Sequence, residues 1–210
     1  MPLRQSRANA TRKLCVASRR LAGCACRRRH IDQGIAVEEI DLVLERLTEL
    51  HDTRNFDCGG PTVLSESMRA GYCLRDEKLD RLRTYVAVKA TEDARKADGT
   101  KDVVGFFSLV AGTMPTDDLP EEARDASYGM PLSLGVIFLD MLARHIAYEG
   151  RGVGTFLLLG AIQCAVEASS IVGAAGIFLV AASDRAYRLY KEWSFIDLDG
   201  GEYTGYNRML

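Results

Sequence analysis

Histidine and closely spaced cysteine pairs are scarce in this chain. The three histidines, His30, His51 and His145, are far apart, and no two of the six cysteines have C-x-x-C spacing. Zinc and redox sites usually show that spacing. Without an export signal, the cysteines do not indicate a disulfide framework either. We therefore expect no metal site and a reducing, cytoplasmic location.

Long uninterrupted apolar runs are also lacking. The most apolar stretches contain Asp140, Arg144 and His145 or are interrupted by glycine, whereas a membrane helix needs about 20 apolar residues. The 210 residues are 47% hydrophobic and 27% charged, which is the ordinary balance of a globular protein. We expect one core and no membrane anchor.

Acidic residues are missing from the first thirty positions, which carry nine Arg or Lys residues. Removing these nine from 27 leaves 18 basic residues against 29 acidic ones, a net charge of −11 for the rest of the chain. Three interpretations stay open: an Arg-rich transit peptide, a disordered arm for nucleic acid or an anionic surface, and upstream sequence read from a wrongly assigned start codon. We favour the third because the segment shows no helical or strand period. Residues 1–34 are then an extension, and residues 35–210 the folded domain.

The first half of the folded domain predicts strands and short helices. Residues 37–47 predict a strand, with a helix as the competing interpretation, and residues 51–60 predict a turn. Residues 61–82 suit one or two short helices. Two strands, at 84–90 and 103–112, form a hairpin with Asp98 and Gly99 at its tip.

The second half predicts a parallel unit. A long loop over 113–133 is followed by near-continuous apolar runs at 134–145 and 173–182, which are typical of buried strands. The helix expected at 152–170 connects them, so the two strands should be parallel. Residues 183–193 predict a further helix, and residues 194–210 one or two closing strands.

Three glycines at alternate positions, Gly150, Gly152 and Gly154, lie between the first buried run and the helix. A glycine-rich turn that opens a helix presents backbone N–H groups to an anion, and glycine lets a phosphate approach closely. The turn lacks the lysine of a Walker loop, and its spacing differs from the G-x-G-x-x-G of dinucleotide sites. It therefore predicts a phosphate site of another class.

Residues 149–154, EGRGVG, resemble the pyrophosphate loop of the GCN5-related N-acetyltransferases, the GNAT superfamily, whose pattern is Gln/Arg-x-x-Gly-x-Gly/Ala. Glu149 departs from the usual Gln or Arg. Residues 183–190, SDRAYRLY, resemble the Asn/Ser-x-x-Ala-x-x-x-Tyr helix of the same family. The resemblance covers residues 35–210. It implies an α/β (α+β) GNAT fold, with a central mixed, twisted sheet of six to seven strands flanked by about four helices.

Residues 51–59, HDTRNFDCG, resemble the N-terminal signature of the GNAT toxins of bacterial toxin–antitoxin pairs, which acetylate the α-amine of aminoacyl-tRNA and stop translation. This resemblance implies acetyl-CoA as cosubstrate, aminoacyl-tRNA as acceptor and a ribbon-helix-helix antitoxin as partner. It leaves monomer and homodimer open. Two other functions also stay open: acetylation of a polyamine-like or protein amine, which an acidic body suits, and CoA binding without catalysis.

The family patterns imply a set of site residues. The strand edge near Leu142 and Arg144 would pair with the pantetheine amide, and Ser183 would contact CoA or cap its helix. Tyr190 would be the general acid. The pKa of a phenol, about 10, is close enough to that of a thiol, about 8.5, for the phenol to suit proton transfer to the leaving thiolate. The pyrophosphate would be held by Gly150, Arg151, Gly152, Val153, Gly154 and Thr155.

The sequence gives fewer indications of the residues that would bind and activate the acceptor amine. No His or Glu occupies an obvious base position, which favours an α-amine of pKa about 7.7–8.0 over a lysine amine. Phosphates of tRNA would need cations. The local patch that we consider for them consists of Arg81, Arg83, Lys89, Arg144, Arg151, Arg185, Arg188 and Lys191.

Overall fold

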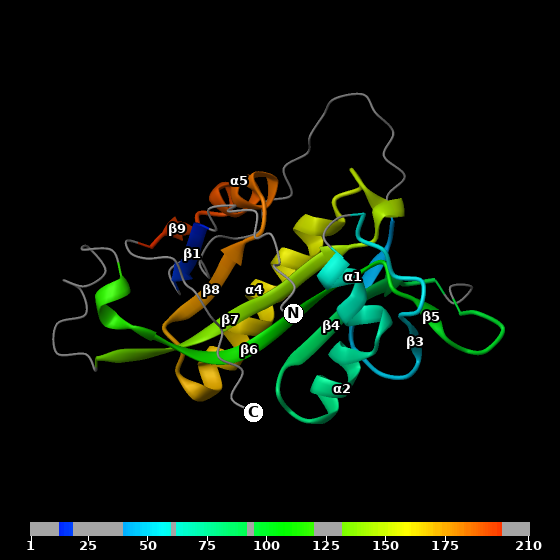
Figure 1. Ribbon diagram of the computed structural model, residues 1–210, viewed down its shortest axis with the longest axis horizontal. Helices are drawn as coiled ribbons and strands as arrows, with labels where there is room; N and C mark the ends of the chain where they lie inside the picture. Colours follow the sequence, from blue (N-terminus) through cyan, green and yellow to red (C-terminus); the bar gives the residue numbers. More distant parts are fainter. Residues whose placement is uncertain (1–12, 19–39, 60–61, 92–94, 120–131, 199–210) are drawn as a thin grey trace, which may run out of the picture.

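The computed structural model describes residues 13–18, 40–59, 62–91, 95–119 and 132–198 (Figure 1). Its main sheet has seven strands in the order β2-β4-β6-β7-β8-β1-β9. These strands are β1 (Lys13–Ser18), β2 (Leu42–Arg46), β4 (Arg83–Lys89), β6 (Gly105–Pro115), β7 (Ser133–Arg144), β8 (Gly176–Ala181) and β9 (Ile196–Asp197). A small parallel sheet pairs β3 (His51–Asp52) with β5 (Lys101–Asp102).

The helices of the described residues cover both faces of this sheet. They are α1 (Thr62–Arg69), α2 (Tyr72–Lys78), α4 (Val153–Val172) and α5 (Asp184–Glu192), with single 3-10 turns at η3 (Thr116–Asp118) and η4 (Ile146–Tyr148). The mixed sheet and the four helices confirm the predicted fold class. The predicted parallel pair is confirmed as β7 and β8, and the predicted hairpin as β4 and β6.

The alternating directions of the side chains along the strands show which face of the sheet each pair of helices covers. Ala87 and Phe107 belong to the core cluster that contains the α4 and α5 side chains. Their neighbours Val86, Val88 and Phe106 belong to the cluster beneath α1 and α2. Because successive strand residues point to opposite faces, α4 and α5 cover one face and α1 and α2 the other.

Helix α4 is longer and more apolar than we expected of any stretch in this chain from the sequence. Its 20 residues have a mean hydropathy of 1.7, so by length and composition alone it could cross a membrane. The glycines at 154 and 160 do not interrupt it. Leu157, Leu158 and Ala161 are fully buried against the sheet, so we interpret α4 as the core helix of the fold, as its place between two buried strands requires.

Three further boundaries differ from the sequence predictions. Strand β1 lies inside the basic segment where no element was expected, and it pairs with β8 and β9. Strand β6 continues to Pro115 and β7 begins at Ser133, so the long loop starts later than predicted, and its residues 120–131 lie outside the described residues. Residues 194–210 contribute β9, while residues 199–210 lie outside the description.

Candidate active site

The site begins where β7 and β8 part. The two strands pair only from Ile137 to Leu139 on β7, although β7 continues to Arg144. The register between β6 and β7 shifts at the same level, because Leu139 faces Leu109 and Met141 faces Ser108, which leaves Asp140 as the extra residue. A bulge of this kind bends a strand. The last five residues of β7 therefore turn one edge away from β8.

A glycine turn closes this opening at the carboxyl ends of the strands. Gly150 and Gly152 have φ values of +74° and +75°, a conformation that side chains with a Cβ rarely adopt. Gly154 is helical, and a Cβ at any of the three positions would meet no heavy atom within 4 Å. The glycines therefore leave open space beside the first N–H groups of α4, which is the arrangement an anion needs.

Glu149, the departure from the family pattern, is paired with two arginines. Its Oε1 lies 2.5 Å from a guanidinium nitrogen of Arg144 and 2.5 Å from one of Arg185. The hydrogen bond from Arg185 and the charge of Arg144 lower the pKa of the Glu149 carboxyl below its ordinary value. The carboxylate is therefore compensated by its neighbours.

Helix α5 starts at the same edge of the sheet. Ser183 is its N-cap, and the Ser183 Oγ accepts a hydrogen bond from the Ala186 N–H at 3.2 Å. Tyr190 lies six residues further along α5, about 9 Å from its start at 1.5 Å per residue. Its side chain is buried, 5.7 Å from the ring of Phe195. Tyr187 is different, since its hydroxyl donates to Asp197 at 2.8 Å.

The HDTRNFDCG segment supports the turn that leads into the glycines. The Ile146 N–H donates to the Asp57 carbonyl at 2.7 Å. The His145 Nδ1 accepts from the Ala147 N–H, so its Nε2 is the atom that donates to the Asn55 carbonyl, at 3.3 Å. The Phe56 ring lies edge-on to His145. Sequence reasoning found this motif only by resemblance, because its contacts are made across 90 residues of chain.

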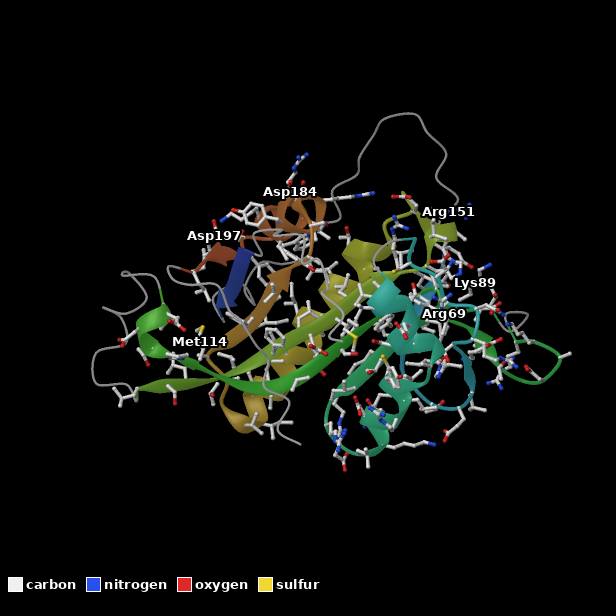
Figure 2. The ribbon with its side chains drawn as sticks, viewed as in Figure 1. Arg69, Lys89, Met114, Arg151, Asp184 and Asp197 are labelled. Carbon is white, nitrogen blue, oxygen red and sulfur yellow. The ribbon has the colours of Figure 1, made fainter. Side chains whose placement is uncertain are left out.

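Most of the predicted site residues lie at one edge of the sheet. Arg144 ends β7, Leu142 lies two residues before it, and Ser183 follows β8. The residues from Gly150 to Thr155 form the turn and the start of α4. The side chain of Val153 is buried in the core, so only its backbone is available to a ligand. In Figure 2, Arg151 and Asp184 lie on the same upper side of the molecule.

The predicted cation patch is divided between separate places. Arg83 forms an ion pair with Asp80. In the sheet, Arg83 is level with Leu109 on β6 and with Leu139, near the middle of β7. Arg81 is near Asp76, so these two arginines are away from the glycine turn. Lys89 does lie at the site edge, with its Nζ 5.8 Å from the centre of the Tyr148 ring.

The residues present fit the phosphate part of acetyl-CoA. The turn has two glycines in the left-handed region, unobstructed space and the N-terminus of a 20-residue helix. Two arginines lie beside it. Among the described residues, no group of three or more His, Cys, Asp or Glu side chains is arranged to hold a metal ion.

Comparison with known proteins identifies the family. No protein-family model matches the chain. The tRNA-acetylating toxin of Mycobacterium tuberculosis H37Rv is 30% identical over 150 residues, which are 71% of this chain and 81% of the relative. The chain belongs to the GNAT toxins. The probable toxin TacT of Sinorhizobium fredii is likewise 30% identical, over 69% of this chain and 78% of its own length.

Solved structures of GNAT toxins share the fold. AtaT complexed with acetyl-methionyl-tRNAfMet has a TM-score of 0.67 and 26% identity, covering 77% of this chain and 91% of AtaT. AtaTR bound with AcCoA has a TM-score of 0.61 and 26% identity, covering 76% of this chain and 88% of the other. A tyrosine-to-phenylalanine variant of KacT, 21% identical with a TM-score of 0.66, supports the fold.

Proposed function

We propose that this protein transfers the acetyl group of acetyl-CoA to the α-amine of aminoacyl-tRNA and so blocks translation as a toxin. The observation that carries the proposal is the opening between β7 and β8, which ends in a glycine turn at the start of α4. The family of tRNA-acetylating toxins supports the acceptor, and the AtaT structures with AcCoA and acetylated tRNA support both substrates.

Different segments around the opening would bind different parts of acetyl-CoA. The edge of β7 from Asp140 to Arg144 is not paired with β8, so its backbone groups near Leu142 and Arg144 are placed for the pantetheine amide. The backbone from Gly150 to Thr155 would hold the pyrophosphate at the positive end of α4. Ser183 caps α5 through its Oγ and keeps its hydroxyl hydrogen for a CoA contact.

Tyr190 supplies the proton in this proposal. The amine nitrogen attacks the acetyl carbon, the N–C bond forms, and the C–S bond breaks to leave a thiolate. The Tyr190 hydroxyl would donate its proton to that sulfur, and the amine would lose one to water. Tyr190 suits this task because α5 returns along the sheet from the site edge and carries it about 9 Å inward, toward the level where β7 and β8 separate.

A side-chain base is not needed for this acceptor. An α-amine has an ordinary pKa of about 7.7–8.0, so a useful fraction is neutral at physiological pH. The two histidines of the described residues are His51 and His145. The Nδ1 atom of each accepts a hydrogen bond from a backbone N–H and stabilises a local turn. This favours an α-amine over a lysine side chain.

The proposal extends to location, partners and domain limits. A toxin that acts on tRNA works in the cytoplasm and needs an antitoxin, for which we propose a ribbon-helix-helix protein. The structure of a tyrosine-to-phenylalanine mutant of the toxin AtaT bound to the C-terminus of the antitoxin AtaR supports an antitoxin as the partner. We place the acetyltransferase domain at residues 35–210, with residues 1–34 as an extension that adds strand β1 to the sheet of this domain, between β8 and β9.

An amine-acetylating enzyme for polyamine-like substrates is the second candidate. The net charge of −11 beyond residue 30 favours it, because an acidic surface attracts cationic substrates. The two functions separate in one assay, in which purified protein and acetyl-CoA are offered charged tRNAs and polyamines side by side. Acetylation of polyamines alone would exclude the tRNA function.

The test of the mechanism compares two tyrosines of one helix. Tyr190→Phe should lower the rate of acetyl transfer to charged tRNA by about a hundredfold or more, and should abolish growth arrest when the full chain is induced. CoA binding, measured by calorimetry, should persist. Tyr187→Phe is the matched control, because the Tyr187 hydroxyl is bonded to Asp197, and it should remain active. Equal activity of the two variants would exclude Tyr190 as the acid.

A further inference from the structure

Glu149 stands where the family pattern has Gln or Arg, directly before the glycine turn. Its Oε1 is the single atom that meets both Arg144 and Arg185. The Glu149 side chain is 50% exposed, while Arg144 is 22% and Arg185 75% exposed. The triad is therefore at the mouth of the site and not in the core.

The two arginines come from opposite sides of the opening. Arg144 is the last residue of β7, and Arg185 lies in the first turn of α5, which follows β8. Glu149 thus joins the β7 side to the β8–α5 side beside the turn where an anion would bind. Asp184, the neighbour of Arg185, has no ion pair with either arginine among those of the described residues.

A carboxylate and a phosphate bind the same kinds of partner. Both accept charge-assisted hydrogen bonds from guanidinium groups, often two at a time. Both are also favoured near the N-terminus of a helix. An anionic ligand at the glycine turn therefore competes with Glu149 for Arg144 and Arg185, whereas a Gln at this position would carry no charge to compete.

We propose that Glu149 is an internal competitor for the phosphate groups of CoA. In the free protein it holds Arg144 and Arg185 together, and a phosphate-bearing donor takes over these arginines when it binds. Glu149 therefore weakens the hold on acetyl-CoA and on product CoA alike, and promotes exchange of the two. This inference rests on the proposed function, because it places CoA at the glycine turn.

The experiment measures binding by calorimetry with the full chain. CoA and pantetheine are the two probes, and only CoA carries phosphates. Glu149→Gln should bind CoA about threefold to tenfold more tightly than the wild type, which lies within the range expected for the two ion pairs that Glu149 makes. Pantetheine affinity should stay the same, and the gain for CoA should shrink as salt is raised.

Two controls separate this competition from simpler explanations. Asp184→Asn removes one negative charge at the same edge and should change CoA affinity by less than twofold. In an Arg185→Gln background, Glu149→Gln should gain less, because one of the contested cations is gone. A similar gain from Asp184→Asn, or a full gain without Arg185, would overturn the proposal.

Weaker CoA binding by a Glu149→Gln protein whose thermal unfolding is unchanged would also overturn it, since Glu149 would then be a brace that the site needs. CoA binding by the wild type separates the proposed function from this inference. If the wild type binds no CoA, the proposed function fails with this inference. If the wild type binds CoA and Glu149→Gln gains nothing, only this inference fails.

Discussion

Asp52 is a buried carboxylate that holds two cations from different parts of the chain. It accepts hydrogen bonds from the Arg54 side chain at 2.9 and 3.0 Å and from Lys96 Nζ at 2.6 Å. We expect Asp52→Asn to lower the free energy of unfolding by about 1–3 kcal/mol, because charged hydrogen bonds at a buried site are lost. Urea denaturation measures this. Asp98→Asn is the control, since Asp98 is half exposed, and it should cost less than about 0.5 kcal/mol.

The same residue predicts a pH dependence. Hydrogen bonds from Arg54 and then Lys96 hold the pKa of Asp52 well below its usual range. A carboxyl whose pKa is lower in the folded state stabilises the fold above its unfolded pKa of about 3.9, and this contribution is lost as pH falls toward the folded pKa. The unfolding free energy of the wild type should therefore fall below about pH 4 more steeply than that of Asp52→Asn. Parallel curves for the two proteins would contradict this assignment.

At the scale of elements, the FDCG turn at residues 56–59 contacts η4, and we expect this contact to position the glycine turn. Gly59 has a φ of +69°, and a Cβ there would lie 2.4 Å from Ile146 Cδ1 and 2.9 Å from Ile146 Cγ1. Ile146 begins η4, which leads directly to Glu149 and Gly150. A displacement of Ile146 should therefore move the glycine turn.

Gly59→Ala should destabilise the protein by about 1–3 kcal/mol, through left-handed strain and the clash. It should also weaken CoA binding, as calorimetry would show. Gly99→Ala is the matched control, because Gly99 has a φ of +81° but nothing within 4 Å of its would-be Cβ. It should cost about 1 kcal/mol and leave CoA affinity unchanged. Equal loss of CoA binding in both variants would mean that η4 does not position the turn.

Elements with a clear local period were predictable from the sequence. The apolar runs of β7 and β8 and the long helix between them indicated a parallel pair, and the three glycines indicated an anion site at its end. The strand β1 was missed, because its residues lie in a segment with no alternating pattern. The partners of Glu149 were missed as well, since the register that brings Arg185 to it across 36 residues is a property of the packed fold.

At the scale of the whole molecule, most described cations are already paired. At least eleven of the sixteen Lys and Arg residues described beyond position 40 lie within 4 Å of a carboxylate: Arg46, Arg54, Arg75, Lys78, Arg81, Arg83, Lys96, Lys101, Arg144, Arg185 and Lys191. A paired cation has less charge to offer an RNA phosphate. If residues 1–30 belong to the protein, we expect the nine cations of this segment, which has no acids, to contribute to tRNA affinity.

The salt dependence of tRNA binding tests this charge distribution. Each phosphate contact contributes about −0.7 to −0.9 to the slope of log K against log salt. Lys13 pairs with Ala181 at the end of β8, which places the start of β1 at the edge of the sheet that holds the site. Changing Arg4, Arg7 and Arg12 together to Gln should therefore flatten the slope by about two units. Lys78→Gln, which removes a cation already paired with Glu49, should leave it unchanged. A slope that is the same in all three proteins would assign tRNA affinity to the folded domain alone, with Lys89 beside the glycine turn as the first residue to change next.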